Sequence, residues 1–233
     1  MGRSEISGMQ ERIKIIKYEP TEIHNKDTKE CSAVEGNNVK GTISWTANMR
    51  IEKYNDDESY KAGVPDEVHY VKGNTATMKG LFTLWQLAMG NYINTTNYVK
   101  PTYSGTEYDV YPLDNTNTYI GVGNGAGTAY ATDDALEGDT QAWVKCDSGY
   151  PIIDSSNPNT LQVSATFGPG VAEGWNWHEW GIANGNMGSP GTRPVESIVL
   201  FNRRNDDMGQ KGSNATWVII ADLIIAPNAS ASP

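Results

Sequence analysis

The stretch Gly41–Tyr54 alternates between polar and apolar residues from Thr42 to Glu52. Its apolar positions are Ile43, Trp45, Ala47, Met49 and Ile51, and the residues between them are polar or charged. A period of two is that of a β-strand with one face in a core and the other in water. Because antiparallel sheets bury one face in this way, the stretch constrains the chain to pack such sheets against one another.

Other segments predict further strands. Leu161–Phe167 alternates in the same way, and Trp217–Ala226 carries apolar residues on both faces, as an interior strand does. Shorter strands are predicted at 13–18, 68–71, 118–120, 142–144 and 197–201, with polar loops at 202–207 and 209–212. The 24 glycines supply turns between them. We therefore predict an all-β fold, an antiparallel β-sandwich of jelly-roll-like character.

One segment has a different period. Apolar residues recur at spacings of three and four in the stretch 76–89, at Met78, Leu81, Phe82, Trp85, Ala88 and Met89. This spacing predicts one packed α-helix, with Thr75 or Thr77 as its N-cap and Gly90 at its end. We expect the wide apolar stripe to cover an open edge or end of the sheets, which places Trp85 in the core.

The chain divides into three predicted parts. Residues 1–38 contain the strand-like segment of Ile13, Ile15 and Tyr18, which Pro20 stops, followed by a polar arm that we expect to reach a neighbouring subunit. Residues 39–226 form the sandwich domain, and 227–233 a flexible tail. A chain of 233 residues is long enough to bury such a core without disulfides or metals.

Charge and composition exclude several classes of function. The net charge of −10 argues against binding the phosphates of nucleic acid, which requires clustered Lys and Arg. No apolar run approaches the ~20 residues that span a bilayer, and the charged N-terminus does not resemble a secretion signal. We therefore expect synthesis in a cytoplasm without export. There, free thiols at Cys31 and Cys146 are favoured over a disulfide, which stays an alternative.

Motifs for cofactors and metals are incomplete. Gly121-x-Gly123-x-x-Ala126 satisfies a loose dinucleotide-binding pattern, but no apolar helix follows it, so a glycine-rich turn is favoured. His178-Glu179 begins like a zinc-binding motif, but the second histidine is missing, and His24 and His69 have no ligand-like spacing. The acidic clusters at 56–58 and 205–207 leave a loop-bound calcium ion as an alternative to solvated turns.

No signature of a catalytic site is present. Glu173 and Glu179 are a candidate carboxylate pair for glycoside hydrolysis, but nothing in the sequence fixes their separation. The chain also lacks a nucleophile elbow. We therefore expect a protein that is not an enzyme, with no catalytic, cofactor-binding or metal-binding residues.

Three of the seven tryptophans fall between Trp175 and Trp180. One hypothesis makes Trp175, Trp180 and His178 a platform for carbohydrate, since exposed indoles stack on sugar rings. The favoured hypothesis is core packing, with Trp177 and Trp180 buried on opposite faces of a strand and Glu179 hydrogen-bonded near a loop. The predicted aromatic core comprises Trp45, Trp85, Phe167, Trp177 and Trp217.

Several segments between 68 and 226 together resemble a family of structural proteins from tailed bacteriophage virions. In order, they are Tyr119–Gly123, Thr132–Leu136, Asp147–Pro151, Ala165–Phe167, Trp177–Ile182 with Asn184, Asn202-Arg203, Gly209-x-Lys211 and Thr216-Trp217. The helix near Leu81–Gly90 resembles the single helix of that family. Two features depart from the family pattern: Ala183 replaces a bulky residue, and 185–195 is longer. The first 60 residues are poorly covered.

The resemblance implies a virion component without catalytic residues. It would decorate the capsid exterior as an auxiliary protein or belong to the tail or fibre assembly. Its expected partners are other virion proteins, such as major capsid or tail proteins, and further copies of itself, with neither nucleic acid nor membrane. The alternative is a carbohydrate-binding module that uses the Trp175–Trp180 stretch and takes a host glycan as its ligand.

Overall fold

The computed structural model describes residues 31–32, 41–186 and 198–229. The predicted N-terminal strand and arm, apart from Cys31 and Ser32, therefore lie outside the described residues, as do residues 230–233 of the predicted tail. Strands dominate the described chain, and they pair antiparallel in several sheets packed together. The predicted all-β antiparallel sandwich is confirmed.

The first sheet is built around two long strands. β2 (Gly41–Tyr54) pairs with β14 (Thr216–Ala229) over fourteen residues each. The order is β1 (Cys31–Ser32), β2, β14, β10 (Thr160–Phe167) and β9 (Ile152–Ile153), and β3 (Glu67–Val71) also pairs with β2. β14 continues through Pro227 to Ala229, so it includes the first three residues of the predicted tail.

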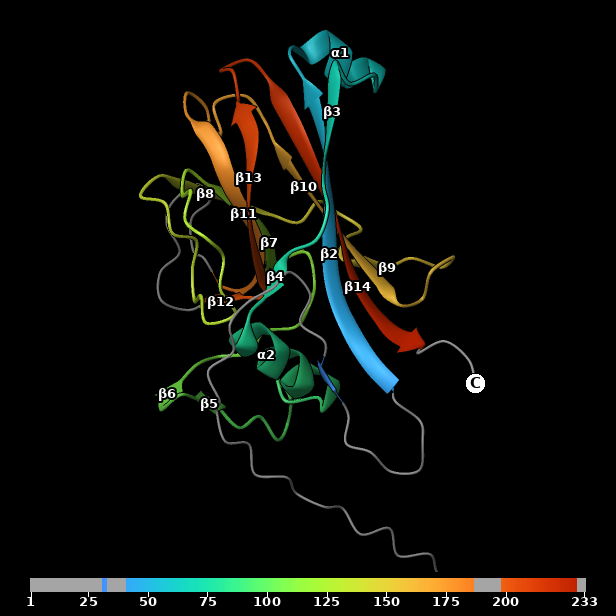
Figure 1. Cartoon of the computed structure of the whole chain (residues 1–233), viewed down its shortest axis with the longest axis vertical. Coiled ribbons are helices and arrows are strands. Elements are labelled where there is room, and N and C mark those ends of the chain that lie inside the picture. The colour runs from blue at the N-terminus through green and yellow to red at the C-terminus, as the bar shows by residue number, and fades with distance from the viewer. Residues whose placement is uncertain (1–30, 33–40, 187–197, 230–233) are drawn as a thin grey trace, which may run out of the picture. The chain divides into compact units, whose positions relative to one another are not determined.

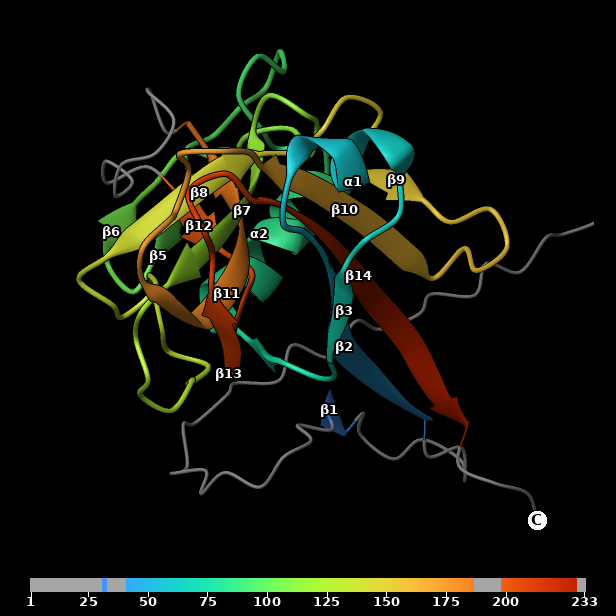
Figure 2. The same ribbon diagram turned by 90° about the horizontal axis from the view of Figure 1, so that it is seen from above.

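The second sheet faces the first across the core, as Figures 1 and 2 show. Its order is β4 (Thr75–Ala76), β13 (Asn202–Gln210), β11 (Asn176–Gly185), β7 (Thr118–Gly123) and β8 (Gln141–Lys145), and β12 (Ile198–Leu200) pairs with β11. A separate hairpin joins β5 (Thr102–Tyr103) to β6 (Thr106–Glu107). β13 corrects the sequence prediction, which assigned 202–207 and 209–212 to loops.

The core between the sheets holds most of the predicted aromatic residues. Phe167, Trp177 and Trp217 are at most 4% exposed, and the ring centroid of Trp177 lies 5.0 Å from that of Phe167 and 4.6 Å from that of Trp217. Trp45 is partly buried against the same cluster. Apolar residues of β2 and β14 alternate into this cluster, as the period of two predicts.

Two helices complete the described chain. α1 (Asp57–Ala62) begins after Asp56, whose side chain accepts a hydrogen bond from the Ser59 backbone N–H, so the acidic cluster predicted as a turn is a capped helix start. α2 (Met78–Ala88) lies within the predicted range of 76–89, with Thr77 as its N-cap. It packs beside β12 and lies towards one end of the sheets (Figure 1).

Candidate interaction surfaces and the buried Glu179 junction

The tryptophan stretch lies in β11 and its approach, and it is largely buried. Trp180 is 0% exposed, so it is not accessible to a ligand, and Trp175 is half-buried against Trp177 at a centroid distance of 6.2 Å. His178 is partly exposed, with its Nδ1 3.8 Å from Asp207 Oδ1. The candidate platform of Trp175, Trp180 and His178 therefore does not form one open aromatic surface.

Trp177 and Trp180 do not lie on opposite sides of the sheet. Both belong to the core cluster between the sheets. The regular pairing is interrupted between them: from Trp177 to Glu179 on β11, the partner residue on β13 moves from Gly209 to Asn205. Regular alternation is not maintained across such an irregularity. The predicted opposite orientation was therefore wrong.

Glu179 forms the centre of a buried polar junction. Its Oε1 accepts hydrogen bonds from the backbone N–H groups of Gly125 (3.2 Å) and Gly138 (2.7 Å), and its Oε2 from the backbone N–H of Glu137 (2.9 Å). Arg203 Nε donates to the same Oε2 at 2.7 Å. The prediction that Glu179 is hydrogen-bonded near a loop is confirmed. The two loops are those that contain Gly125 and Gly138.

Arg203, on β13, uses every donor of its guanidinium in this junction. Besides Glu179, its Nη1 donates to Asp133 Oδ2 (2.9 Å) and to the Thr128 carbonyl, and its Nη2 to Glu137 Oε2 (2.7 Å) and the Gly127 carbonyl. Burial lowers the pKa of Arg203, but the hydrogen bonds to the three carboxylates outweigh it, so the pKa is raised above its ordinary value. The three carboxylates thus stabilise the positive charge of Arg203.

The glycine-rich segment 121–127 cradles a carboxylate of its own chain. A Cβ on Gly125 would lie 2.5 Å from Glu179 Oε1, and one on Gly123 would also collide with that oxygen. Successive backbone N–H groups around a carboxylate are the arrangement with which loops bind anions. The segment therefore has a packing role. The predicted glycine-rich turn was wrong for Gly121 to Gly123, which belong to β7.

The candidate carboxylate pair is split between the interior and the surface. Glu173 is exposed in the approach to β11, whereas Glu179 is fully buried with all four contacts inside the protein.

Within residues 31–32, 41–186 and 198–229, no group of three or more His, Cys, Asp or Glu side chains is arranged to hold a metal. In the same part of the chain, no helix has the length and apolar character needed to cross a bilayer.

Cys146 is a free thiol that is 6% exposed. Burial, followed by the nearby Asp147 carboxylate, raises its pKa to about 12. Because the thiolate is the reactive form, we expect Cys146 in a Cys31→Ser variant to resist Ellman's reagent until the protein unfolds. Rapid modification of the folded variant would contradict this account.

The same pKa shift has a defined effect on stability. The pKa of Cys146 is higher in the folded protein than its unfolded value of 9.0. The contribution of the thiol to the free energy of unfolding is therefore complete below about pH 9 and is lost between about pH 9 and 12. In the Cys31→Ser background, the free energy of unfolding should therefore fall less steeply over that window when Cys146 is also replaced by Ser.

Much of the predicted apolar stripe of α2 faces solvent, at Met78, Trp85 and Met89, whereas Phe82 packs against the cluster of Tyr108 and Val110. The helix buries Gly80, Thr83 and Gln86, while Trp85 is 67% exposed. Thr77 fixes this orientation, because its backbone N–H donates to the Phe201 carbonyl at 3.0 Å and its side chain hydrogen-bonds the Leu200 carbonyl. The assignment of Trp85 to the core was therefore wrong.

Close packing at Gly80 explains why that face of α2 is buried. A Cβ on Gly80 would lie 2.6 Å from the Phe201 Cα, so only a glycine allows the helix to approach the chain between β12 and β13. The side chains left outside form what we call the Trp85 surface, and all of them are exposed: Met78, Trp85, Met89 and Val99.

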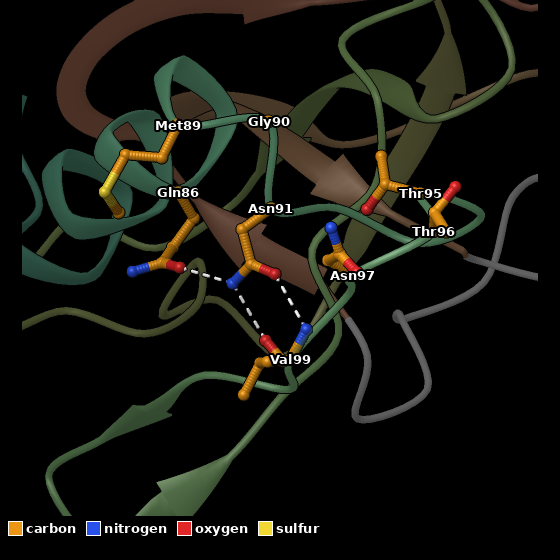
Figure 3. A pocket seen from close by; sticks show the side chains of 8 residues that line it. All are labelled: Gln86, Met89, Gly90, Asn91, Thr95, Thr96, Asn97 and Val99. Atoms are coloured by element: carbon orange, nitrogen blue, oxygen red, sulfur yellow. Dashed lines mark hydrogen bonds between the residues drawn. The ribbon is translucent and has the colours of Figure 1, made fainter.

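An open depression of about 530 Å³ borders the Trp85 surface at the end of α2. Figure 3 shows Asn91 between Gln86 and Val99. Its Nδ2 donates hydrogen bonds to Gln86 Oε1 (2.6 Å) and to the Val99 carbonyl (2.8 Å). Every residue that lines the depression is uncharged: Gln86, Met89, Gly90, Asn91, Thr95, Thr96, Asn97 and Val99.

The outer face of the first sheet is a second exposed surface. Tyr70 on β3 lies opposite Arg50 on β2, which lies opposite Ile220 on β14. Their neighbours Ile219 and Ile51 point into the core, so this row points outward. We define the outer sheet face by Val68, Tyr70, Arg50, Val218, Ile220 and Ile224, all of which are partly or largely exposed.

No protein-family model, curated protein or solved structure matches this chain.

Proposed function

We propose that this chain is a non-enzymatic component of a tailed-phage virion, located on the capsid exterior or in the tail or fibre assembly. It acts by binding, and its partners are other virion proteins and further copies of itself. The sequence resemblance motivates the proposal, and the contacts made by the residues that carry that resemblance support it.

Those residues hold the fold together. Asp147 accepts hydrogen bonds from the side chains of Ser164 (2.7 Å) and Thr166 (3.1 Å). Lys211 is fully buried, and its Nζ donates to the Gly168 carbonyl at 2.8 Å. Like Glu179 and Arg203, these side chains are engaged in internal contacts rather than presented to a substrate. A shared set of such residues supports a shared scaffold.

The observation that carries the binding role is the outer sheet face. Tyr70 is 65% exposed, in one row across three strands with Arg50 and Ile220. Tyr and Arg are residue types enriched at interfaces. The sheet that presents them is held rigid by the long β2–β14 pair. We propose that this face docks on the virion.

Incorporation into particles tests the docking role. A charge introduced at the centre of the face, in Ile220→Lys, should reduce the copies per gradient-purified particle at least tenfold, because a buried unpaired charge is costly in an interface. Quantitative mass spectrometry of a phage complemented with the variant gives the readout.

The matched control is Met89→Lys, which places the same charge on the Trp85 surface and should leave incorporation unchanged. Circular dichroism and the melting temperature establish that both variants fold. If Ile220→Lys enters particles as well as the unmodified protein does, the outer sheet face is not the docking surface.

A further inference from the structure

The Trp85 surface belongs to a stretch of the chain without acidic residues. Between Val68 and Thr106 the chain has no acidic residue, although its net charge is −10. The stretch has three lysines: Lys100 is paired with Asp109 at 3.2 Å, Lys79 lies over the Tyr108 ring at 5.0 Å, and Lys72 is the third. The region around α2 therefore contributes no negative charge in an otherwise acidic protein.

Trp85 lies on α2 one helical turn before Met89, which lines the depression, although Trp85 itself does not line it. Residues four apart are neighbours on a helix surface, so the indole and the depression are adjacent. Among the seven tryptophans, Trp85 alone is classed as exposed, which makes it the indole available for stacking.

The depression offers hydrogen-bonding groups that are not used internally. The side chains of Thr96 and Asn97 are exposed, and neither forms a hydrogen bond within the described part of the chain. Asn91 is fully engaged with Gln86 and Val99, so it holds the loop of Thr95, Thr96 and Asn97 against the helix end (Figure 3). The hydroxyl and amide groups are thus presented from a tethered loop.

We propose that Trp85 and the adjoining depression form a binding site for a neutral saccharide. The C–H face of a pyranose ring stacks on an indole, and its hydroxyl groups pair with neutral amides and hydroxyls such as those of Asn97 and Thr96. The volume of about 530 Å³ lies within the range of small-ligand sites, roughly 300–1,000 Å³. A charged ligand would find no ionic partner among the lining residues.

This ligand chemistry fits the site better than a protein partner does. A stable protein interface buries about 800 Å² per partner around a dry apolar centre. Here the exposed apolar side chains of the Trp85 surface border an open depression. Polar residues line much of it: Gln86, Asn91, Thr95, Thr96 and Asn97. The inference does not depend on the proposed docking of the outer sheet face.

Binding of the intact protein to an array of neutral and acidic glycans tests the proposal, followed by titration calorimetry with the soluble form of the strongest neutral glycan. We expect neutral glycans to bind, with affinity at least tenfold weaker in Trp85→Ala and Asn97→Ala and little effect of added salt. The bound glycan should also protect the protein's exposed tryptophan from acrylamide quenching.

The control variant is Tyr70→Ala, which removes an aromatic ring of similar exposure from the outer sheet face and should keep full glycan affinity. Binding of no neutral glycan, of acidic glycans alone, or with unchanged affinity in Trp85→Ala would overturn the proposal. So would loss of Trp85→Ala from virions, which would make this surface a protein contact. If Ile220→Lys is still incorporated into particles, that result would contradict the docking role alone.

Discussion

Replacing Glu179 by glutamine is expected to lower the free energy of unfolding by about 3–5 kcal/mol, which is the cost of removing one partner of a buried ion pair. The glutamine amide would turn a donor towards either Arg203 Nε or the backbone N–H groups of Gly125 and Gly138, all of which donate. Arg203, with 3% of its side chain exposed, would lose one of its three carboxylate partners. Chemical denaturation monitored by tryptophan fluorescence measures the change.

The matched control for this variant is Glu173→Gln. Glu173 is an exposed carboxylate six positions earlier, so its replacement should change the free energy of unfolding by less than about 0.5 kcal/mol. In a double-mutant cycle, Glu179→Gln and Arg203→Met should be strongly non-additive because the two side chains share one network. A loss below about 1 kcal/mol in Glu179→Gln would show that the carboxylate is not structural.

Trp177→Ala is expected to cost about 3–5 kcal/mol, in the range for removing a buried aromatic side chain. Its indole is fully buried between Phe167 and Trp217, and its Nε1 donates to the Ala172 carbonyl at 2.8 Å. Deletion would leave a cavity between the two sheets and an unpaired carbonyl. The midpoint of urea denaturation gives the readout.

Trp85→Ala is the control for that substitution, since it removes the same side chain from an exposed position. We expect it to lose less than about 1 kcal/mol because the indole is 67% exposed. Equal losses in the two variants would contradict the division between a buried tryptophan cluster and an exposed tryptophan on α2.

The alternating strands were predictable because one residue in two faces the core. Gly41–Tyr54 and Leu161–Phe167 carry this signal in their own sequence, and β2 and β10 follow it closely. The capped amphipathic segment likewise predicted α2 to within two residues at its start. Local periodicity is sufficient to predict a strand or helix when the face on which a residue lies determines whether it is buried.

The remaining features depend on contacts between distant segments. The sequence of β13 resembles a polar loop because the partners of Asn202 and Arg203 lie on β11 and on loops 66 or more residues away, which no local pattern records. Trp85 faces solvent because Thr77 and Gly80 bind the chain near Phe201. The glycines at 123, 125 and 138 were the available signal for the junction, but nothing in the sequence pairs them with Glu179.

Imaging of purified virions by electron cryomicroscopy tests the central claim most directly. The account predicts density for this chain on the capsid exterior or in the tail or fibre assembly. The outer sheet face of Tyr70 and Ile220 should lie against a neighbouring virion protein, and Trp85 should be exposed to solvent. Absence of the chain from virions would contradict the account, as would particles in which the outer sheet face is free.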